Sequence, residues 1–299
     1  MIKSIKDVLS GMQVARPMPT GVKFLDENLG GLYPGEVTVV CGYDNDGKTA
    51  LMIRMIHRLC FDNNIPVLVV LVGMEEQTFL SCMAAYHCGI ICDDIHKVSM
   101  DDDNTKTFWQ LLREKPFYMA SKEDLKVEKI EDFKREIKNQ GIKAVFVEKA
   151  SALELYRRGR SFIGLFLKGL AKELKVTMVV EQELWNSLWE GCSSISLTQI
   201  EETDLGHYAD NVIGIVDYNN HGGYDEQARD MRGLVKVIIM KHKGLVSLKK
   251  DAFLRKITLY CHDWRRAMEY ETEHIFESNP HIQSLFRKFD CELADEECL

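Results

Sequence analysis

The sequence has no stretch that could serve as a membrane anchor or an export signal. None of its apolar runs approaches the ~20 residues of a transmembrane helix, and its start, Met-Ile-Lys-Ser-Ile-Lys-Asp, has no signal-peptide core. We therefore expect a cytoplasmic protein with no membrane partner. With 299 residues, of which 45% are hydrophobic, the chain can bury one large core or two modest ones.

Paired cysteines and zinc-ligand spacings are also missing. The nine cysteines are scattered, odd in number and mostly set in apolar runs, which indicates reduced, buried thiols and argues against a disulfide framework. His87, Cys88 and Cys92 lie close together in the sequence, but no C-x-x-C or histidine pair accompanies them. We therefore set a zinc site aside.

An excess of positive charge is lacking as well. The net charge of −8 argues against a protein that coats nucleic acid through bulk electrostatics, although it is compatible with a local basic channel. Part of the imbalance comes from residues 290–299, which are most simply a solvated acidic tail.

The most informative feature that is present is a phosphate-binding loop. Gly42 to Thr49 reads Gly-Tyr-Asp-Asn-Asp-Gly-Lys-Thr and fills every fixed position of G-x-x-x-x-G-K-[ST]. A β-branched run, residues 36–41, precedes it, and residues 50–60 have helical spacing, so the loop lies in the strand, loop and helix context that phosphate binding needs. A plain strand-to-helix turn is the alternative.

In such a loop, backbone N–H groups and the positive end of the helix surround the phosphates of a nucleotide. Lys48 then reaches the terminal phosphates and the Thr49 hydroxyl holds Mg²⁺, so we expect ATP and Mg²⁺ as ligands. The residues predicted to contact the nucleotide are Gly42, Asn45, Asp46, Gly47, Lys48, Thr49 and Ala50.

Downstream of the loop, apolar β-branched runs alternate with amphipathic ones, which predicts an α/β fold with a largely parallel, twisted sheet flanked by helices. Two further strands, around Ser247 and at residues 256–261, are close enough to form an antiparallel edge hairpin. The other expected strands are residues 66–72, 143–147, 177–180, 212–216 and 235–240, and the expected helices are residues 76–88, 130–139 and 161–174.

The first residues form an amphipathic segment of their own. Pro17 and Pro19 stop a short helix that is marginal when alone, so its apolar face must dock, either on its own domain or on a neighbouring subunit. That face carries Ile2, Ile5, Val8, Leu9 and Met12.

The segment upstream of the phosphate loop resembles a family signature. Residues 19–36 read Pro-Thr-Gly-Val-Lys-Phe-Leu-Asp-Glu-Asn-Leu-Gly-Gly-Leu-Tyr-Pro-Gly-Glu. This is similar to the T-G-x-x-x-L-D-x-x-x-G-G-L-x-P-G-[DE] that opens the motor domain of DnaB-type replicative helicases, within the RecA-like group. Four further stretches resemble motifs of that family in the same order, namely residues 74–90, 168–176, 208–212 and 237–244.

The resemblance implies a RecA-like P-loop ATPase that forms a ring, usually of six subunits, with ATP between neighbours and single-stranded DNA through the centre. The N-terminal helix then corresponds to the linker that latches one subunit onto the next, and we expect the family's separate N-terminal domain to be absent. We accordingly divide the chain into a linker-type helix and extended linker at residues 1–18, an ATPase domain at 19–270, and a C-terminal extension with an acidic tail at 271–299.

Several catalytic positions of the family are altered. Glu148 ends an apolar strand where the family has its metal-binding aspartate, and we expect it to reach Mg²⁺ through water; an ordinary strand-end carboxylate is the alternative. Gly73 stands where the family has its water-activating glutamate, and glycine cannot polarise water. Glu76, or Glu75 beside it, is the nearest replacement, although both also suit the first turn of the next helix, whose dipole they oppose.

Further family positions differ in charge. Glu183 replaces the sensor glutamine, and its carboxylate would repel the γ-phosphate unless a metal or a lysine intervenes. Ile200 replaces an arginine. Lys243 corresponds to the arginine finger that acts in trans, and it keeps the charge but loses the bidentate fork. The resemblance thus implies that nucleotide-binding residues persist while hydrolytic residues drift.

The predicted DNA-binding residues are Arg157, Arg158 and Arg160. They lie on a loop after the Glu148 strand, where RecA-like rings line their channel, and arginines around a glycine can track a phosphate backbone. A solvated loop is an equally good interpretation.

We therefore expect a ring-forming, ATP-dependent DNA helicase motor of the DnaB type that acts on single-stranded DNA. A second hypothesis is a hydrolysis-impaired assembly or regulatory module that binds nucleotide without unwinding DNA. A third is a regulatory ATPase closer to the clock-protein branch of RecA-like folds, with a protein partner.

Overall fold

The computed structural model describes residues 16–88, 103–153, 156–157, 160–184, 195, 200, 203–222, 234–243 and 250–255. The N-terminal helix, Arg158, the C-terminal extension and the two strands expected around Ser247 and at residues 256–261 lie outside these residues. The division into three parts therefore stays a prediction.

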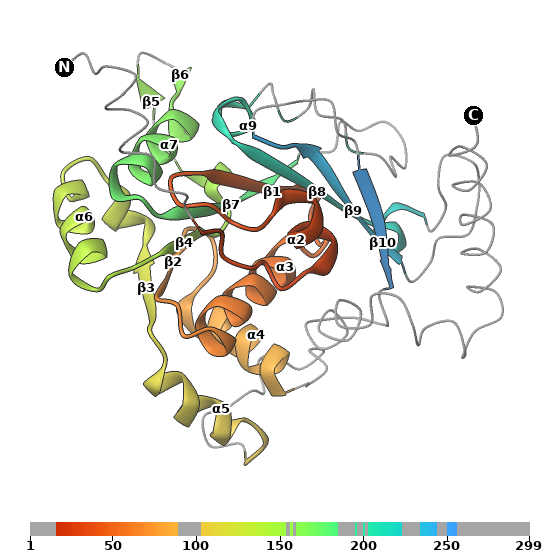
Figure 1. Cartoon of the computed structure of the whole chain (residues 1–299), viewed down its shortest axis with the longest axis horizontal. Coiled ribbons are helices and arrows are strands. Elements are labelled where there is room, and N and C mark those ends of the chain that lie inside the picture. The colour runs from red at the N-terminus through yellow and green to blue at the C-terminus, as the bar shows by residue number, and fades with distance from the viewer. Residues whose placement is uncertain are drawn as a thin grey trace.

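An eight-stranded sheet forms the centre of the protein (Figure 1). Its order is β10-β9-β8-β1-β7-β4-β2-β3, and the pairings among the last six strands are all parallel. The predicted largely parallel α/β sheet is thereby confirmed. The parallel strands are β1 (Val37–Gly42), β2 (Val67–Leu71), β3 (Phe117–Ser121), β4 (Ala144–Val147), β7 (Thr177–Glu183) and β8 (Asn211–Asp217).

The predicted antiparallel edge is confirmed, and in the described residues it is formed by β9 and β10. β9 (Leu234–Lys241) runs antiparallel to β8, and β10 (Lys250–Arg255) runs antiparallel to β9. β10 falls between the two segments predicted to form the hairpin. The edge strand β3 at the other side was not predicted, because its side chains are only partly buried and do not alternate clearly.

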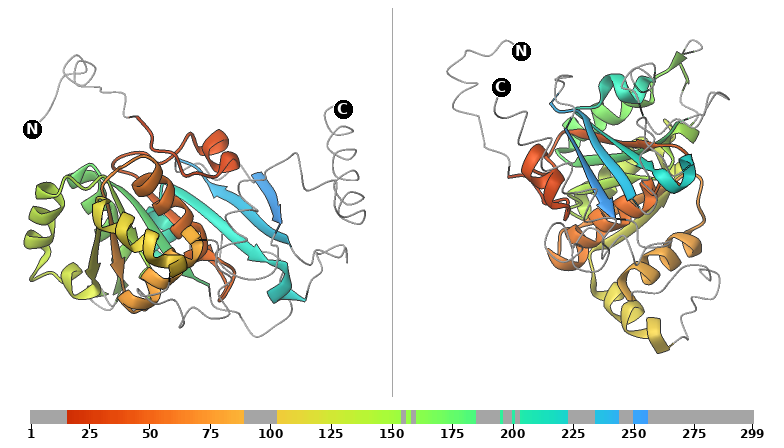
Figure 2. Two further views of the ribbon diagram at one scale, coloured as in Figure 1. Left: turned by 90° about the horizontal axis from the view of Figure 1, so that it is seen from below. Right: turned by 90° about the vertical axis from the view of Figure 1, so that its right-hand side faces the viewer.

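Helices cover both faces of the sheet (Figure 2). One layer consists of α2 (Lys23–Leu29), α3 (Lys48–Ile56) with its π-helical continuation η1 (His57–Asp62), α4 (Glu76–Cys88) and α5 (Asp103–Glu114). The opposite layer consists of α6 (Ile130–Asn139), α7 (Ile163–Leu174) and α9 (Asp204–Tyr208). The predicted helices at residues 76–88, 130–139 and 161–174 are confirmed as α4, α6 and α7.

Two hydrophobic cores result, one on each side of the sheet. On β1, Val37, Val39 and Cys41 belong to the core under α6, α7 and α9, whereas Val40 belongs to the core under α3 and α4. All six residues of β1 are buried, as expected for a strand in a sheet covered on both faces. This makes the strand that carries the phosphate loop one of the most enclosed elements of the fold.

The opening signature folds onto α3. The Asp26 carboxylate accepts hydrogen bonds from the backbone N–H of Thr20 at 2.7 Å and from the Thr20 hydroxyl at 2.8 Å. Arg54 of α3 donates to the carbonyl oxygen of Gly21 at 2.7 and 3.0 Å. The Thr-Gly and Leu-Asp pairs of the signature thus fix the entry of the chain against the helix that follows the phosphate loop.

Parallel pairing brings the carboxyl ends of β1, β2, β4 and β7 to one edge of the sheet. The phosphate loop, Gly73, Glu148 and Glu183 follow or end these strands, so they gather at that edge. Within the described part of the chain, no helix is both long enough and apolar enough to traverse a bilayer.

Candidate nucleotide-binding site

The phosphate loop joins β1 to α3 in a strained, preformed turn. Asn45 and Gly47 have φ values of 61° and 93°, in the left-handed region. Lys48, only 5% exposed, donates from Nζ to the carbonyl oxygen of Tyr43 at 2.6 Å and so closes the loop on itself. The N-terminus of α3 therefore begins inside the loop, where backbone N–H groups and the helix dipole favour a phosphate.

The first glycine of the loop is required by packing. A Cβ on Gly42 would lie 2.7 Å from the backbone oxygen of Ile215 on β8 and 3.3 Å from Cβ of Asp46. The backbone oxygen cannot move without disturbing the sheet, so only glycine fits this position.

Asp46 stabilises the phosphate loop through buried hydrogen bonds. Its side chain is fully buried and accepts hydrogen bonds from the backbone N–H of Tyr43 at 3.1 Å and from Nε2 of His221 at 2.9 Å. Asn220 donates to the carbonyl oxygen of Asn45 at 2.9 Å. Asn220 and His221 belong to the 3₁₀ helix η5 (Tyr218–His221) after β8, so this short helix holds the loop in shape.

Thr49 meets a carboxylate that the sequence pattern did not single out. Its hydroxyl donates to Glu181 of β7 at 3.0 Å. Burial raises the pKa of Glu181 to about 7, Lys48 opposes this rise, and the negative charge of Glu148 adds to it. The sequence signal that could have revealed Glu181 is a glutamate directly after the strand-type run Thr177 to Val180, which the structure shows to be buried.

Mg²⁺ suits the groups gathered beside Thr49. This ion prefers oxygen ligands, and the Thr49 hydroxyl and the Glu181 carboxylate supply them 3.0 Å apart. Burial, which raises the pKa of Glu181, disfavours its charged form, and a bound divalent cation would stabilise that form.

Glu148 holds the loop after β2. Its Oε2 atom accepts hydrogen bonds from the backbone N–H groups of Val72, Gly73 and Met74 at 3.2, 2.8 and 3.2 Å, and the residue is 4% exposed. The carboxylate therefore has a structural task, which corresponds to the alternative interpretation of this residue. Its second oxygen, Oε1, is the atom left for a water-mediated metal contact.

Glu75 and Glu76 lie exposed at the start of α4. Glu76 occupies the first turn of that helix, where its charge opposes the helix dipole. This agrees with the alternative interpretation, in which the two glutamates are first-turn acids of the helix. Neither of them is placed as an evident replacement for the family's water-activating glutamate, whose position Gly73 occupies.

Glu183, which replaces the family's sensor glutamine, is paired with a lysine. Lys149, directly after Glu148, forms an ion pair with Glu183 at 3.0 Å. The hydrogen bond to Glu183 raises the pKa of Lys149 above its ordinary value, so its ammonium group is charged throughout the physiological range. Because the positive charge of Lys149 offsets the negative charge of the carboxylate, Glu183 can lie near a phosphate with less electrostatic repulsion.

The comparisons with known proteins agree with this geometry. The family described as DnaB-like helicase C terminal domain matches residues 17–260, most of the chain. The chain belongs to this family.

Individual relatives of this DnaB-like domain are distant. The replicative DNA helicase DnaB of Buchnera aphidicola subsp. Baizongia pistaciae (strain Bp) is 22% identical over an alignment of 246 residues, and the match covers 75% of this chain and 51% of the relative. The chain therefore spans about half the length of that curated protein.

Two solved structures share the fold. The structure of a DnaB-like replicative helicase, described with its interactions with primase, has a TM-score of 0.67 at 18% identity and covers 86% of this chain and 65% of that chain. A second solved structure, described as an ATPase domain, has a TM-score of 0.68 at 17% identity, with coverages of 84% and 92%. At these identities the likeness concerns the fold alone.

Lys243 of the DnaB-like domain lies at the edge of the sheet opposite to its own phosphate loop. β9 ends beside Val212, at the start of β8, so Lys243 belongs to the amino ends of the parallel strands. Its backbone N–H donates to Asn211 at 3.2 Å, and its ammonium group lies 4.3 Å from the ring centre of Tyr33. Lys243 therefore cannot reach a nucleotide on its own phosphate loop.

Lys241, two residues earlier on the same strand, is buried and donates to the carbonyl oxygens of Gly206 and His207, both at 3.1 Å.

The predicted DNA-binding loop contains a small hairpin. β5 (Tyr156–Arg157) and β6 (Arg160–Ser161) pair antiparallel, with Arg157 opposite Arg160. The backbone thus places two of the three predicted DNA-binding arginines side by side on the hairpin. Ile200, a separate position where the family has an arginine, is fully buried.

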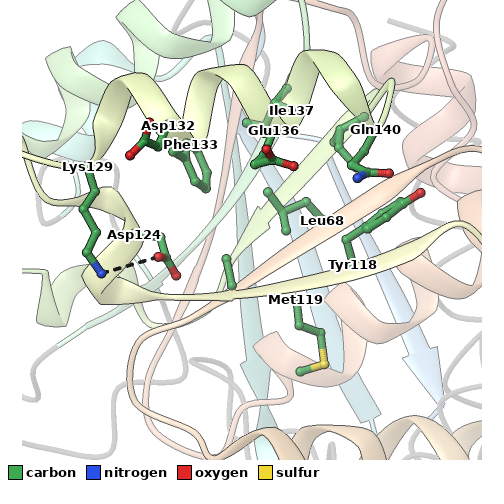
Figure 3. Close-up of a pocket in the computed structure, with 12 residues that line it drawn as sticks. Leu68, Tyr118, Met119, Asp124, Lys129, Asp132, Phe133, Glu136, Ile137 and Gln140 are labelled. Atoms are coloured by element: carbon green, nitrogen blue, oxygen red, sulfur yellow. Dashed lines mark ion pairs between the residues drawn. The ribbon is translucent and has the colours of Figure 1, made fainter.

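A separate cavity lies between α6 and strands β2 and β3 (Figure 3). It has a volume of about 540 Å³, and Lys129 at one end pairs with Asp124 at 3.9 Å. Asp132 and Glu136 add negative charge to its lining. Its one lysine, Lys129, is outnumbered by three acidic side chains, so this acidic hollow does not compete with the phosphate loop as the nucleotide site.

Two cysteines of the described residues should resist alkylation in the folded protein. Burial raises the pKa of the Cys41 and Cys60 thiols to about 12, so the reactive thiolate is scarce at pH 8. Among the four cysteines that the structure describes, we expect iodoacetamide at pH 8 to label the partly exposed Cys88 first, and to label Cys41 and Cys60 only after unfolding in urea. Mass spectrometry of the labelled peptides measures this, and equal labelling rates in folded and unfolded protein would contradict it.

Proposed function

We propose that this DnaB-like domain is an ATP-driven motor that acts on single-stranded DNA as part of a homo-oligomeric ring. The observation that carries the proposal is the phosphate loop itself. Lys48 and Thr49 are held at the N-terminus of α3 by Tyr43 and Glu181, beside a second buried carboxylate, Glu148. This arrangement suits a nucleoside triphosphate with Mg²⁺.

In the proposed mechanism, the phosphates of ATP lie in the loop and replace the Tyr43 carbonyl oxygen as the partner of Lys48. The Thr49 hydroxyl and Glu181 would hold the metal, and Oε1 of Glu148 would contact it through water. Mg²⁺, when bound, neutralises charge on the β- and γ-phosphate oxygens. Asp46 and His221 keep the loop closed, so that its N–H groups are oriented before the nucleotide arrives.

The position of Lys243 supports a ring. Because this residue lies at the far edge of its own sheet, its charge can act on the γ-phosphate only across a contact between subunits. We propose six subunits, with the N-terminal helix as the latch between neighbours and the cytoplasm as the compartment. Residues 1–15 lie outside the described residues, so the latch rests on the sequence pattern.

DNA binding gives the decisive experiment. We expect single-stranded DNA to stimulate steady-state ATP hydrolysis, and the triple change Arg157→Ala, Arg158→Ala and Arg160→Ala to weaken DNA binding. It should also flatten the plot of log affinity against log salt by roughly 0.7 for each phosphate that the protein no longer neutralises. Fluorescence anisotropy with a labelled oligothymidylate measures both effects.

Arg135→Ala is the matched control, since this arginine on α6 is exposed and pairs only with nearby Asp132 among the ion pairs of the described residues. An unchanged affinity of the triple variant would show that the arginine loop is merely solvated. The second candidate function, a nucleotide-binding module without hydrolysis, is favoured by Gly73. ATP binding without turnover, with or without DNA, would support that candidate and overturn the motor.

A further inference from the structure

The ion pair between Lys149 and Glu183 stands directly beside the phosphate loop. In the register of β1 with β7, Glu183 pairs with Gly42, the first residue of the loop. The next residue, Leu184, donates its backbone N–H to the carbonyl oxygen of Gly42 at 2.9 Å. Glu183 is therefore fixed to the loop by the sheet, and its side chain remains 22% exposed.

Lys149 fills the space that Gly73 leaves open. A Cβ on Gly73 would lie 2.9 Å from Cδ of Lys149. Lys149 adopts a left-handed backbone conformation, with φ of 46°, which is uncommon for a residue with a side chain. The glycine after β2, the lysine after β4 and the glutamate at the end of β7 thus form one contiguous group.

The other glutamates described at this edge have different tasks. Glu148 accepts three backbone hydrogen bonds, and Glu181 accepts the Thr49 hydroxyl in a buried position. Glu75 and Glu76 are exposed at the start of α4. Glu183 is the glutamate that is anchored to the phosphate loop and still accessible to water.

We propose that Glu183 is the general base for ATP hydrolysis and that Lys149 is the residue that positions it. The proposal rests on the proposed function, since it requires ATP in the phosphate loop. A water molecule gives a proton to Glu183 while its oxygen forms a bond to the γ-phosphorus. The bond from the γ-phosphorus to the β,γ-bridging oxygen breaks, and its electron pair leaves with ADP. Glu183 later returns the proton to solvent.

The test compares ATP hydrolysis and nucleotide binding in single variants. Glu183→Gln keeps the size of the side chain but removes the base, so we expect turnover to fall by about 100-fold or more. Affinity for a fluorescent ATP analogue should stay within about 2-fold of the wild-type value, because a general base stabilises the transition state and does not contribute to the binding of ATP. Glu173→Gln on α7, a half-exposed glutamate that pairs with Lys134, is the control and should keep full turnover.

Lys149 needs a readout that separates positioning from stability. Lys149→Ala should lower kcat by about 10-fold with little change in KM, and Lys149→Arg should recover most of the loss because the charge is restored. Unchanged turnover in Glu183→Gln would overturn the proposal while leaving the motor intact. Loss of turnover in Glu76→Gln instead would move the base to α4. A wild-type chain that binds ATP without any turnover would overturn both the base and the motor.

Discussion

Replacing Lys48 by alanine is expected to abolish ATP turnover and to weaken ATP binding by roughly 10- to 100-fold, because a charge-assisted hydrogen bond contributes about 1.5–3 kcal/mol. The ammonium group is buried inside the loop, where it donates to the Tyr43 carbonyl oxygen at 2.6 Å. No long side-chain motion is needed for it to meet a phosphate. Its contribution should therefore appear in the binding constant as well as in the rate.

Isothermal titration with a non-hydrolysable ATP analogue measures this effect. Lys172→Ala is the matched control, since this lysine is exposed on α7, far along the chain from the loop. The control should bind the analogue as the wild type does. A Lys48→Ala variant with wild-type affinity would show that the loop is a plain strand-to-helix turn.

Replacing Glu148 by alanine is expected to lower the free energy of unfolding by about 2–4 kcal/mol, because three partly buried backbone N–H groups would lose a charged acceptor and a hydrogen bond to a charged group contributes about 1.5–3 kcal/mol. Three backbone N–H groups, those of Val72, Gly73 and Met74, share its Oε2 atom. Glu148→Gln keeps a carbonyl oxygen for these donors and should recover most of the loss. Urea denaturation followed by circular dichroism gives both values.

Glu27→Ala is the control for this experiment. Glu27 is 63% exposed on α2, and its ion pair with Lys23 spans 4.0 Å, so its removal should change stability by less than about 1 kcal/mol. If Glu148→Ala is as stable as wild type, the three hydrogen bonds are not what keeps this carboxylate in place. The metal would then account for the residue better than the loop does.

The phosphate loop and most of the sheet could be predicted because their signals are local. Gly42 to Thr49 is contiguous, and strands such as β2 and β4 are apolar runs bounded by turns. β3 escaped prediction because its residues are only partly buried at the edge of the sheet. For such a strand, burial depends on its neighbours and not on its own pattern.

The supports of the loop could not be predicted from the sequence. Thr49 and Glu181 are 132 residues apart, and Asp46 and His221 are 175 apart. Their contacts depend on β7 and β8 both pairing with β1, which no local pattern reveals. The possibility that a lysine stabilises Glu183 followed from electrostatics, but only the fold shows that the lysine is Lys149.

The opposite placement of the phosphate loop and Lys243 on one sheet has a consequence for symmetry. Two chains that shared a nucleotide through these groups would contact each other with different surfaces, one presenting its loop edge and the other its Lys243 edge. Two chains joined by one such head-to-tail contact leave one unused surface of each kind, so a two-fold dimer cannot satisfy it. Growth would end only by rotational closure, and a geometry that failed to close would give an open helical filament.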